Sequence, residues 1–367
     1  MTPDGGAEYA ERLVRARTAM VGAGVDALCL SVGSDLPYMT GYRAMALERL
    51  TMFVVTLDAE PVVVIPSLEA PRVDRTVETF SVHGWGELED PIAIVDTYLA
   101  GSSVVAVGDE TWSRFTLDLQ AASPNREWRS AGGLMSSLRT TKSPHELAAL
   151  RSAARSVDTV VDAMAEVQFS GRTERDVARE LVDRTLGEGH STMEFWIVAS
   201  GPNGASPHHE PGSRVIKRGD AVVVDFGGHQ DGYASDTTRM FVVEEAPPGF
   251  EEAYDVLRSA QAAAVEHVRP GVTAASVDAV ARDIIAGAGY GERFIHRTGH
   301  GIGMDTHEHP YIVESNTDVL GPGMAFSIEP GIYTPGQWGM RIEDIVAVTD
   351  EGVERINRSD RALRFVG

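Results

Sequence analysis

The 367-residue sequence has almost no cysteine and no long apolar run. Its one cysteine, Cys29, cannot form a disulfide within the chain, and its apolar neighbours in ALCLSV indicate a buried side chain. No run approaches the roughly 20 apolar residues that a membrane span requires. The first residues contain no basic patch followed by an apolar stretch, so we expect neither a secretory nor a transit peptide. These absences predict a cytoplasmic protein without a membrane partner.

Basic residues are also scarce, because 32 Lys and Arg against 54 Asp and Glu give a formal net charge of −22. A surface of this sign repels a phosphate backbone, which argues against nucleic acid as a partner. The apolar content of 43% is ordinary for a globular protein. The length exceeds what one hydrophobic core usually supports, so we expect two domains.

The region from residue 8 to about 125 alternates between helical and strand-like segments. Four short apolar runs, each bounded by Gly, Pro or Asp, are typical of strands covered on both faces: DALCLSV, TMFVVTL, PVVVI and VVAVGD. The stretch SDLPYMTGY contains Pro and Gly and predicts a loop. The whole pattern predicts an α/β domain.

A helix start marks the boundary to a second domain. In LRTTKSPHELAAL, Ser143 can cap a helix, Pro144 fits its first turn and Glu146 completes a capping box. We expect this helix to run to about residue 167. The domains are therefore predicted at residues 1–140 and 141–367.

The second region mixes helices with hairpins. Helical patterns cover about 174–186, 250–268 and 276–288, and MEFWIVAS is strand-like. The segments AVVVDFGG and YASDTTRMFVV predict one hairpin, and MAFSIEPGIY and GMRIEDIVAV predict strands around a second turn. We expect an α+β domain of two halves, each made of a hairpin and helices.

Two aspartates in the first hairpin indicate a cation. Asp225 ends a strand of valines, where an unpaired charge is costly to bury. Asp236 lies eleven residues later on the return strand, about the separation at which a hairpin brings two carboxylates side by side. Like charges this close repel unless a metal ion lies between them.

The second hairpin repeats the arrangement with glutamates, because Glu329 ends the strand MAFSIE and Glu343 lies within MRIEDIVAV. Oxygen-rich ligation with an imidazole suits manganese, cobalt, zinc or iron. Four carboxylates and one imidazole exceed what a single tetrahedral ion takes, so two divalent cations about 3.5 Å apart are predicted. Four of the eleven histidines lie between the hairpins in HRTGHGIGMDTHEHP, which favours a binding site: His296, His300, His307 and His309.

The motifs VVVDFGG, SDTTRMF, TGHGIGMDTHEHP, SIEPGIY and MRIEDIVAV resemble, in order, the metal motifs of the pita-bread metallopeptidases. That family includes methionine aminopeptidase, aminopeptidase P and Xaa-Pro dipeptidase (prolidase), and the resemblance covers about residues 143–360. It implies a curved antiparallel sheet flanked by two pairs of helices. The ligands that it implies are Asp225 on one cation, His300 and Glu329 on the other, and Asp236 and Glu343 bridging both.

The family also uses residues outside the metal shell. By resemblance, His208 in SGPNGASPHHE and His307 contact the substrate and stabilise the tetrahedral intermediate, and the neighbouring His209 matches less well. His296 resembles a histidine that lines the substrate pocket. Arg341 resembles an arginine that orients the metal carboxylates.

The resemblance implies amide hydrolysis by a metal-bridging hydroxide, with Glu329 taking its proton and returning it to the leaving nitrogen. The first 140 residues resemble the creatinase-type domain of prolidase and aminopeptidase P, with DLPYMTGYRAM as its usual turn. In the family this turn tends to overhang the active site of a partner subunit, which implies a homodimer. The compact length favours a prolidase acting on short proline-containing peptides. Aminopeptidase P, which releases the first residue of Xaa-Pro-Xaa peptides, remains the alternative.

Three other functions are weaker alternatives. Creatinase has the same two-domain fold without the metal ligands, and some pita-bread domains have lost their metals and bind proteins instead. The five intact ligand positions argue against both. A side activity on organophosphates is the third alternative, because the same hydroxide can attack phosphorus. Carboxylate and imidazole ligands accept manganese, cobalt or zinc.

Overall fold

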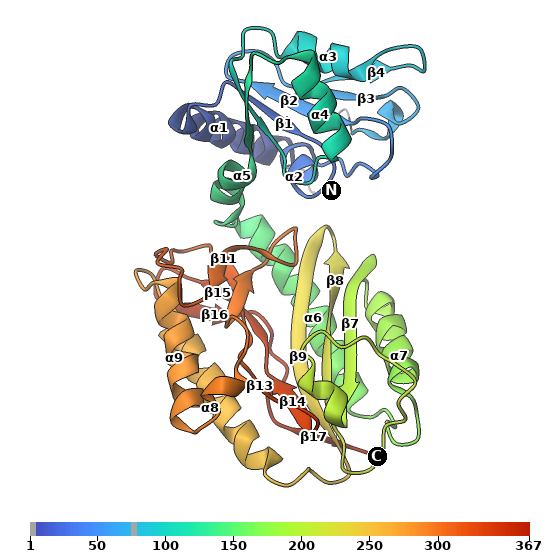
Figure 1. Ribbon diagram of the computed structural model, residues 1–367, viewed down its shortest axis with the longest axis vertical. Helices are drawn as coiled ribbons and strands as arrows, with labels where there is room; N and C mark the ends of the chain where they lie inside the picture. Colours follow the sequence, from blue (N-terminus) through green and yellow to red (C-terminus); the bar gives the residue numbers. More distant parts are fainter. Residues whose placement is uncertain (1–4, 75–78) are drawn as a thin grey trace. The chain divides into compact units, whose positions relative to one another are not determined.

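The computed structural model describes residues 5–74 and 79–367 (Figure 1). They divide into two compact units, one that ends at Arg139 and one that begins at Thr140. Among these residues, no helix combines the length and apolar character that a membrane crossing demands.

The first unit is built on a six-stranded mixed sheet in the order β4-β3-β2-β1-β5-β6. Figure 1 labels the strands β1 to β4 of this sheet. Its centre is β1, which pairs in parallel with β5 and antiparallel with β2. The strands are β1 (Ala27–Leu30), β2 (Met52–Thr56), β3 (Val62–Pro66), β4 (Ser81–Trp85), β5 (Val104–Val107) and β6 (Glu127–Ser130). The helices are α1 (Gly5–Ala23), α2 (Asp35–Thr40), η1 (Ala70–Arg72), α3 (Pro91–Tyr98), α4 (Ser113–Ala122) and α5 (Gly132–Arg139).

Strand β1 is buried on both faces. Cys29 packs in a core with Val95 of α3 and Phe115 of α4, and Leu28, which points to the opposite face, is equally buried. Burial raises the pKa of the Cys29 thiol to about 12, so this cysteine is an inert apolar side chain. The predicted α/β unit with doubly covered strands is confirmed.

The loop predicted for SDLPYMTGY is wrong, because the segment contains α2. Pro37 is the third residue of this helix, where its missing N–H would have had no partner within the helix. Gly41 ends the helix in the left-handed region with φ of 72°. Pro and Gly therefore mark the two ends of a short helix here.

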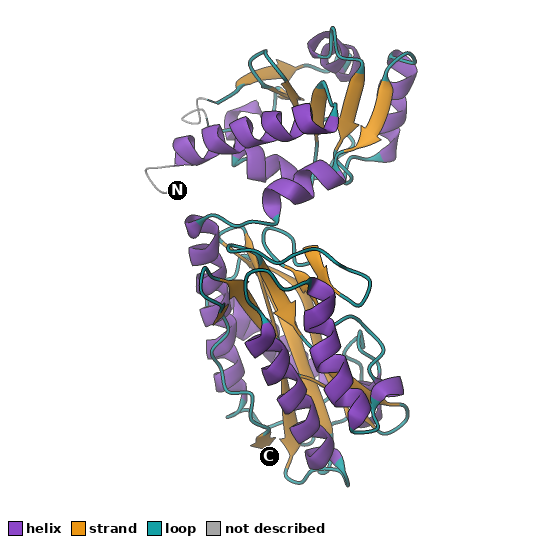
Figure 2. Cartoon of the chain, turned by 90° about the vertical axis from the view of Figure 1, so that its left-hand side faces the viewer, coloured by secondary structure: helices purple, strands orange, loops and turns teal. Residues whose placement is uncertain are grey.

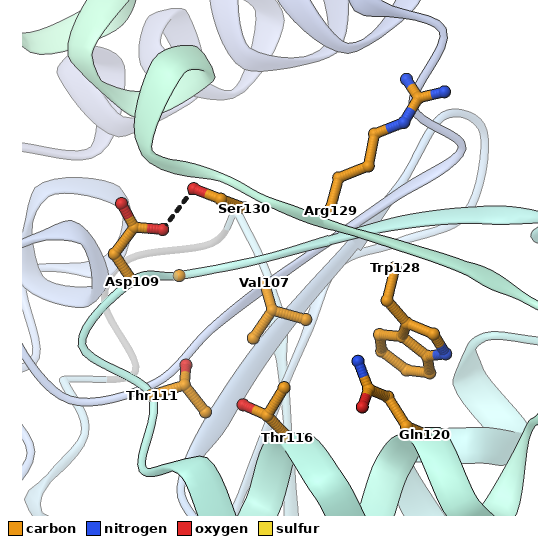
Figure 3. Close-up of a pocket in the computed structure, with 9 residues that line it drawn as sticks. Val107, Asp109, Thr111, Thr116, Gln120, Trp128, Arg129 and Ser130 are labelled. Carbon is orange, nitrogen blue, oxygen red and sulfur yellow. Dashed lines mark hydrogen bonds between the residues drawn. The ribbon is translucent and has the colours of Figure 1, made fainter.

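A cavity of about 290 Å³ lies between α4 and the ends of β5 and β6 (Figure 3). Trp128 and Gln120 face it, and Ser130 donates a hydrogen bond to Asp109 beside it. The described residues of this unit contain no group of three His, Cys, Asp or Glu side chains placed to hold a metal ion.

The second unit contains two larger sheets, in the orders β17-β9-β8-β7 and β11-β10-β12-β15-β16, and the hairpin β13-β14. A bridge between Thr238 and Glu343 joins the two larger sheets. The strands are β7 (Thr192–Ser200), β8 (Ala221–Gln230), β9 (Tyr233–Val243), β10 (Gly299–Gly301), β11 (Glu308–Ile312), β12 (Ala325–Ile328), β13 (Gly331–Thr334), β14 (Trp338–Arg341), β15 (Asp344–Val348), β16 (Val353–Arg355) and β17 (Arg364–Val366).

Helices flank these sheets (Figure 2), and their packing groups α6 with α7 and α8 with α9. Alternate residues of β8 face different pairs, because Val222 packs in the core with α6 and α7 while Val223 packs in the core with α8 and α9. The capping box predicted at Ser143 and Glu146 is present. These helices and the 3₁₀ turns of the unit are α6 (Pro144–Met164), α7 (Glu174–Gly187), η2 (Gly201–Ala205), α8 (Phe250–His267), α9 (Ala274–Gly287) and η3 (Gly291–Arg293).

The two-halved α+β architecture predicted for this unit is confirmed, with one difference in detail. The second predicted hairpin is divided: β12 pairs with β15, and β13 pairs with β14 beyond it. The division falls at Glu329 and Pro330, between β12 and β13. Proline lacks the N–H that a continuous ladder needs, which accounts for the break.

Candidate metal centre

The first hairpin places two aspartates on one face. In the register of β8 and β9, Asp225 lies opposite Thr238 and Gly227 lies opposite Asp236. Asp225 and Asp236 are therefore diagonal neighbours, and side chains two residues apart on a strand share a face. One oxygen of each carboxylate lies within 4.8 Å of the other.

The second pair of carboxylates lies where β12 and β15 part. Ile328 pairs with Asp344, so Glu329 and Glu343 occupy the next positions along the two strands. The Glu343 N–H donates to the Thr238 carbonyl at 3.3 Å, which holds this glutamate beside β9 and its aspartate. Two separate hairpins thus meet at one carboxylate cluster.

A histidine from β10 completes the cluster. His300 Nε2 lies 3.1 Å from Glu329 Oε1 and 3.6 Å from Asp236 Oδ2. Three overlapping groups have ligand atoms within 4.8 Å of one another. They are Asp225, Asp236 and Glu343; His300, Glu329 and Glu343; and Asp236, His300 and His307.

Three carboxylate oxygens in this cluster have no hydrogen-bond partner in the described part of the chain. Asp225 Oδ1, Asp236 Oδ1 and Glu343 Oε1 are buried and accept no hydrogen bond from any residue that the structure describes. A buried carboxylate left in this state is unfavourable. Carboxylate oxygens and an imidazole are ligands for divalent cations, so the residues present fit such ions.

The carboxylates of the cluster titrate abnormally. Burial raises the pKa of Asp236 and Glu343 well above their ordinary values, and the negative charges of their neighbours raise both further. Burial also raises the pKa of Asp225, although the Arg341 guanidinium partly offsets it. Burial acts in the same direction on Glu329, but the hydrogen bond and charge of His300 outweigh it and hold that pKa at about 2.

Arg341 is buried against the cluster and contacts it in two ways. It donates to Asp225 directly, and its Nε donates to Thr238 Oγ1 at 3.2 Å. Thr238 Oγ1 in turn donates to Glu343 Oε2 at 2.8 Å. Arg341 Nη1 also donates to the Tyr333 hydroxyl at 2.6 Å. The arginine therefore contacts one carboxylate and, through Thr238, orients another.

The three histidines predicted beside the metal shell lie in different settings. His307 is exposed, and its ring centroid lies 3.8 Å from that of His300. Burial of its inner atoms and the nearby His300 lower the pKa of His307 to about 4. His296 Nε2 lies 2.9 Å from the Tyr333 hydroxyl. His208 is exposed on the loop after η2, and its charge contributes to the lowered pKa of His307.

Thr238 and Tyr333 were not predicted from the sequence. Thr238 lies two residues after Asp236 on a strand, and this period of two was a usable signal for a side chain on the same face. Tyr333 follows the turn at Pro330, where no period relates it to the ligands.

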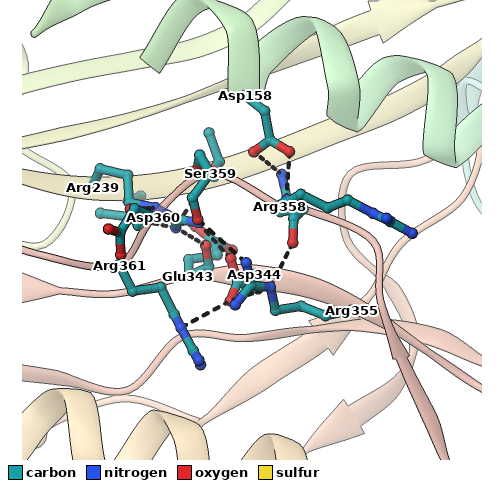
Figure 4. Close-up of polar contacts among 12 residues, drawn as sticks. Asp158, Arg239, Glu343, Asp344, Arg355, Arg358, Ser359, Asp360 and Arg361 are labelled. Atoms are coloured by element: carbon teal, nitrogen blue, oxygen red, sulfur yellow. Dashed lines mark hydrogen bonds and ion pairs between the residues drawn. The ribbon is translucent and has the colours of Figure 1, made fainter. Parts of the chain in front are cut away.

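A buried ion pair lies next to Glu343, one of the residues of the cluster (Figure 4). Arg239 is fully buried, and its Nη2 lies 2.6 Å from Asp344 Oδ1. Its Nη1 donates to the Glu343 carbonyl at 2.5 Å. Asp344 also accepts from Gln261 Nε2 at 3.2 Å and faces Arg355 at 3.6 Å. Arg239 thus fixes the backbone from which the Glu343 side chain reaches the cluster.

Comparisons with known proteins cover almost the whole chain. An Xaa-Pro dipeptidase from Lactobacillus helveticus is 36% identical over 345 residues, which are 90% of this chain and 92% of the relative. The crystal structure of dipeptidase PepE from Mycobacterium ulcerans is similar with a TM-score of 0.93 at 42% identity, and covers 99% of both chains. A recombinant prolidase from Thermococcus sibiricus has a TM-score of 0.91 at 35% identity, and covers 98% of this chain and 99% of its own.

Two family matches divide the chain between them. Residues 12–141 match the creatinase/prolidase N-terminal domain, and residues 148–350 match metallopeptidase family M24. The second match runs through every strand that carries the carboxylate cluster. The chain therefore belongs to metallopeptidase family M24, a family of metal-dependent peptidases, and joins its pita-bread catalytic domain to a creatinase-type N-terminal domain.

Proposed function

We propose that this chain is a dinuclear Xaa-Pro dipeptidase that hydrolyses short proline-containing peptides. The observation that carries the proposal is the set of three buried carboxylate oxygens without a hydrogen-bond partner among the described residues, gathered around His300. The similarity over nearly full length to an Xaa-Pro dipeptidase supports the substrate class.

The five predicted ligands would hold two cations of the manganese, cobalt or zinc type. When bound, these cations lower the pKa of a water molecule and polarise the scissile carbonyl. Arg341 and Thr238 keep the carboxylates aimed into the cluster through the hydrogen bonds described above. In this assignment Asp225 would hold one cation, His300 and Glu329 would hold the other, and Asp236 and Glu343 would serve as ligands of both.

Glu329 is the general base and then the general acid. With a pKa of about 2 it is ionised at neutral pH, so it can accept the proton of the attacking water. It returns that proton to the leaving nitrogen, because an amide nitrogen leaves as a neutral amine only after it is protonated. His307, with a pKa of about 4, is neutral and can donate an N–H to the developing oxyanion, together with His208.

His296 and a neighbouring cavity support a short substrate. His296 Nδ1 donates to the Arg297 carbonyl at 2.7 Å, so its Nε2 accepts from Tyr333 and the ring is fixed. Tyr333 lines a cavity of about 550 Å³ together with Ala205, Ile295 and Arg293. A cavity of this size suits a small ligand.

The proposed function is tested by hydrolysis of an Xaa-Pro dipeptide, an Xaa-Pro-Xaa tripeptide and a Met-Ala peptide. Metal is first removed with a chelator, and manganese, cobalt or zinc is then added back. We expect cleavage of the dipeptide that depends on added metal. Preference for the tripeptide would assign the chain to aminopeptidase P instead, and no cleavage with any of the metals would contradict a peptidase.

The role of Glu329 is tested by Glu329→Gln. We expect turnover to decrease by roughly 10²- to 10⁴-fold, the usual contribution of general acid–base catalysis, while much of the metal binding remains. Isothermal titration with the metal, followed by steady-state kinetics of the loaded variant, measures both. Substantial activity in the metal-loaded variant would contradict the role.

The homodimer and the cytoplasmic location stay predictions. Sedimentation velocity of the purified chain tests the first of them. A monomer at micromolar concentration would contradict the homodimer.

A further inference from the structure

The loop that carries His208 is tied down by one buried carboxylate. This loop, residues 201–212, is the first part of the connection from β7 to β8 and contains η2. Glu174, the first residue of α7, reaches into the loop and has no exposed surface. Glu174 belongs to none of the groups that could hold a metal ion.

Glu174 contacts Ser200, the residue directly before this loop, and three residues within the loop. Its Oε1 accepts from the Ser200 N–H at 2.8 Å, from Ser200 Oγ at 2.7 Å and from Asn203 Nδ2 at 3.0 Å. Its Oε2 accepts from the Gly212 N–H at 3.2 Å and lies 2.8 Å from His209 Nε2. An ionised carboxylate only accepts, so His209 Nε2 is the donor in that contact. The Glu174 side chain therefore links the start of the loop to its end.

The charge state of Glu174 agrees with these contacts. Burial alone would raise its pKa, but the hydrogen bonds from Ser200, His209 and Asn203 together outweigh burial and lower it. Glu174 is therefore ionised at neutral pH. A buried carboxylate with this many donors is a strong and specific anchor.

The other side of the loop rests against the metal centre. Arg341 Nη2 donates to the Pro207 carbonyl at 3.4 Å, directly before His208. The backbone at Gly204 lies so close to β14 that a Cβ on Gly339 would come within 1.9 Å of the Gly204 carbonyl oxygen. The residues on either side of His208 are thus both held in place, Pro207 by Arg341 and His209 by Glu174.

We propose that Glu174 is a positioning residue that acts through His209 to hold His208 at the substrate. The inference rests on the proposed function, because His208 receives its catalytic role there. It also gives the two adjacent histidines separate tasks: His209 faces inward as an anchor, and His208 stays exposed to meet the substrate.

The first test is Glu174→Gln, which keeps the size of the side chain but turns one acceptor into a donor facing His209 and Gly212. We expect kcat to decrease on the order of 100-fold, as misplacement of a catalytic group by about 1 Å can produce. KM and the metal dissociation constant should change by less than about twofold, because only a transition-state contact is lost. Glu180→Gln is the matched control, since Glu180 lies on the same helix and pairs with Arg172 and Arg184 outside the loop.

The second test separates positioning from general damage. His209→Ala should reproduce the loss of kcat, and His209→Gln should restore most of it because the Gln amide can donate to Glu174. In a His208→Ala background, Glu174→Gln should cause little further loss, since both changes act on one group. Hydrogen exchange of residues 201–212 should be faster in Glu174→Gln and in His209→Ala, but unchanged in Glu180→Gln.

The outcomes distinguish this inference from the proposed function. Metal-dependent cleavage of the dipeptide by the unaltered chain decides the function. The role of Glu174 is decided by the kcat of each variant relative to the unaltered chain, measured on the peptide that the unaltered chain cleaves best. The positioning role would be overturned if Glu174→Gln lowered kcat as much in the His208→Ala background as it does in the unaltered chain. It would also be overturned by a His209→Ala variant that keeps full kcat and slow exchange in the loop.

Discussion

Glu343 and Asp344 are neighbours in the chain, are both buried, and meet opposite surroundings. Glu343 points into the carboxylate cluster, where its Oε1 has no hydrogen-bond partner among the described residues. Asp344 points the other way, where Arg239, Gln261 and Arg355 surround it (Figure 4). The difference shows that buried carboxylates serve two purposes. A carboxylate without a partner in the chain is suited to bind a cation, and a carboxylate surrounded by partners stabilises the fold.

The largest effect should follow from removing a ligand on the unpartnered side. Asp236→Ala takes away a carboxylate shared by two of the three ligand groups. Metal ions contribute several kcal/mol to such reactions, so we expect kcat/KM to decrease by about 10³-fold or more and metal affinity to decrease with it. Steady-state kinetics and metal titration measure the change. Asp255→Ala, an exposed aspartate on α8, is the control and should leave both unchanged.

The second largest effect should be a loss of stability when the main partner of Asp344 is removed. Arg239→Met leaves Asp344 buried without its main partner, and loss of one member of a buried pair costs about 3–5 kcal/mol. Urea unfolding of the metal-loaded protein measures the change in the free energy of unfolding. Arg258→Met removes an exposed arginine from a pair on α8 and should cost less than about 1 kcal/mol. Equal effects of the two substitutions would show that the comparison between buried and exposed pairs is wrong here.

The same comparison shows how far the sequence could go at the site. Asp225 and Asp236 could be paired from their eleven-residue spacing because a hairpin has a period of two and a single turn. The partners of Asp344 could not be predicted from spacing, because Gln261 comes from α8 and is brought to β15 only by helix packing. The anchor Glu174 was missed for the same reason: 26 residues separate it from Ser200.

Within the fold, the sequence predicted what local patterns determine. The capping box at Ser143 marked the start of α6 correctly, and four apolar runs marked the inner strands of the first sheet. The edge strands β4 and β6 were missed because they are only partly buried and carry polar residues, as edges commonly do. Their pairing depends on neighbours already in place, which no local pattern reports.

A pH dependence should separate the metal-free protein from the loaded one. Folding raises the pKa of Asp236 and Glu343 above the ordinary values of 3.8 and 4.5. A group with a raised pKa in the folded state contributes stability at pH values below its ordinary pKa, and this stability is lost as pH rises through the folded value. Folding instead lowers the pKa of Glu329 to about 2, so the contribution of this residue to stability is lost only as pH falls from about 4.5 toward 2.

We therefore expect the metal-free protein to lose stability as pH rises above about 4.5, by urea unfolding in the presence of a chelator. Saturating metal should oppose this trend, because the ions bind the deprotonated carboxylates and stabilise the folded state. Asp236→Asn should reduce the pH dependence of the metal-free protein, since it removes one of the groups that titrates. A metal-free protein that gains stability across the same pH range would contradict this assignment of the charges.

The smallest effect on stability should come from an ion pair with good geometry that is partly exposed to solvent. Arg151 of α6 binds Glu354 of β16 through two contacts, at 2.8 and 2.6 Å. Both side chains remain partly exposed, so Glu354→Gln should cost only about 0.2–1 kcal/mol, against about 3–5 kcal/mol for the buried Arg239 pair. Because solvent ions reach this pair, 1 M salt should reduce the difference between Glu354→Gln and the unaltered protein. The loss from Arg239→Met should persist at that salt concentration, since burial rather than contact distance distinguishes the two pairs.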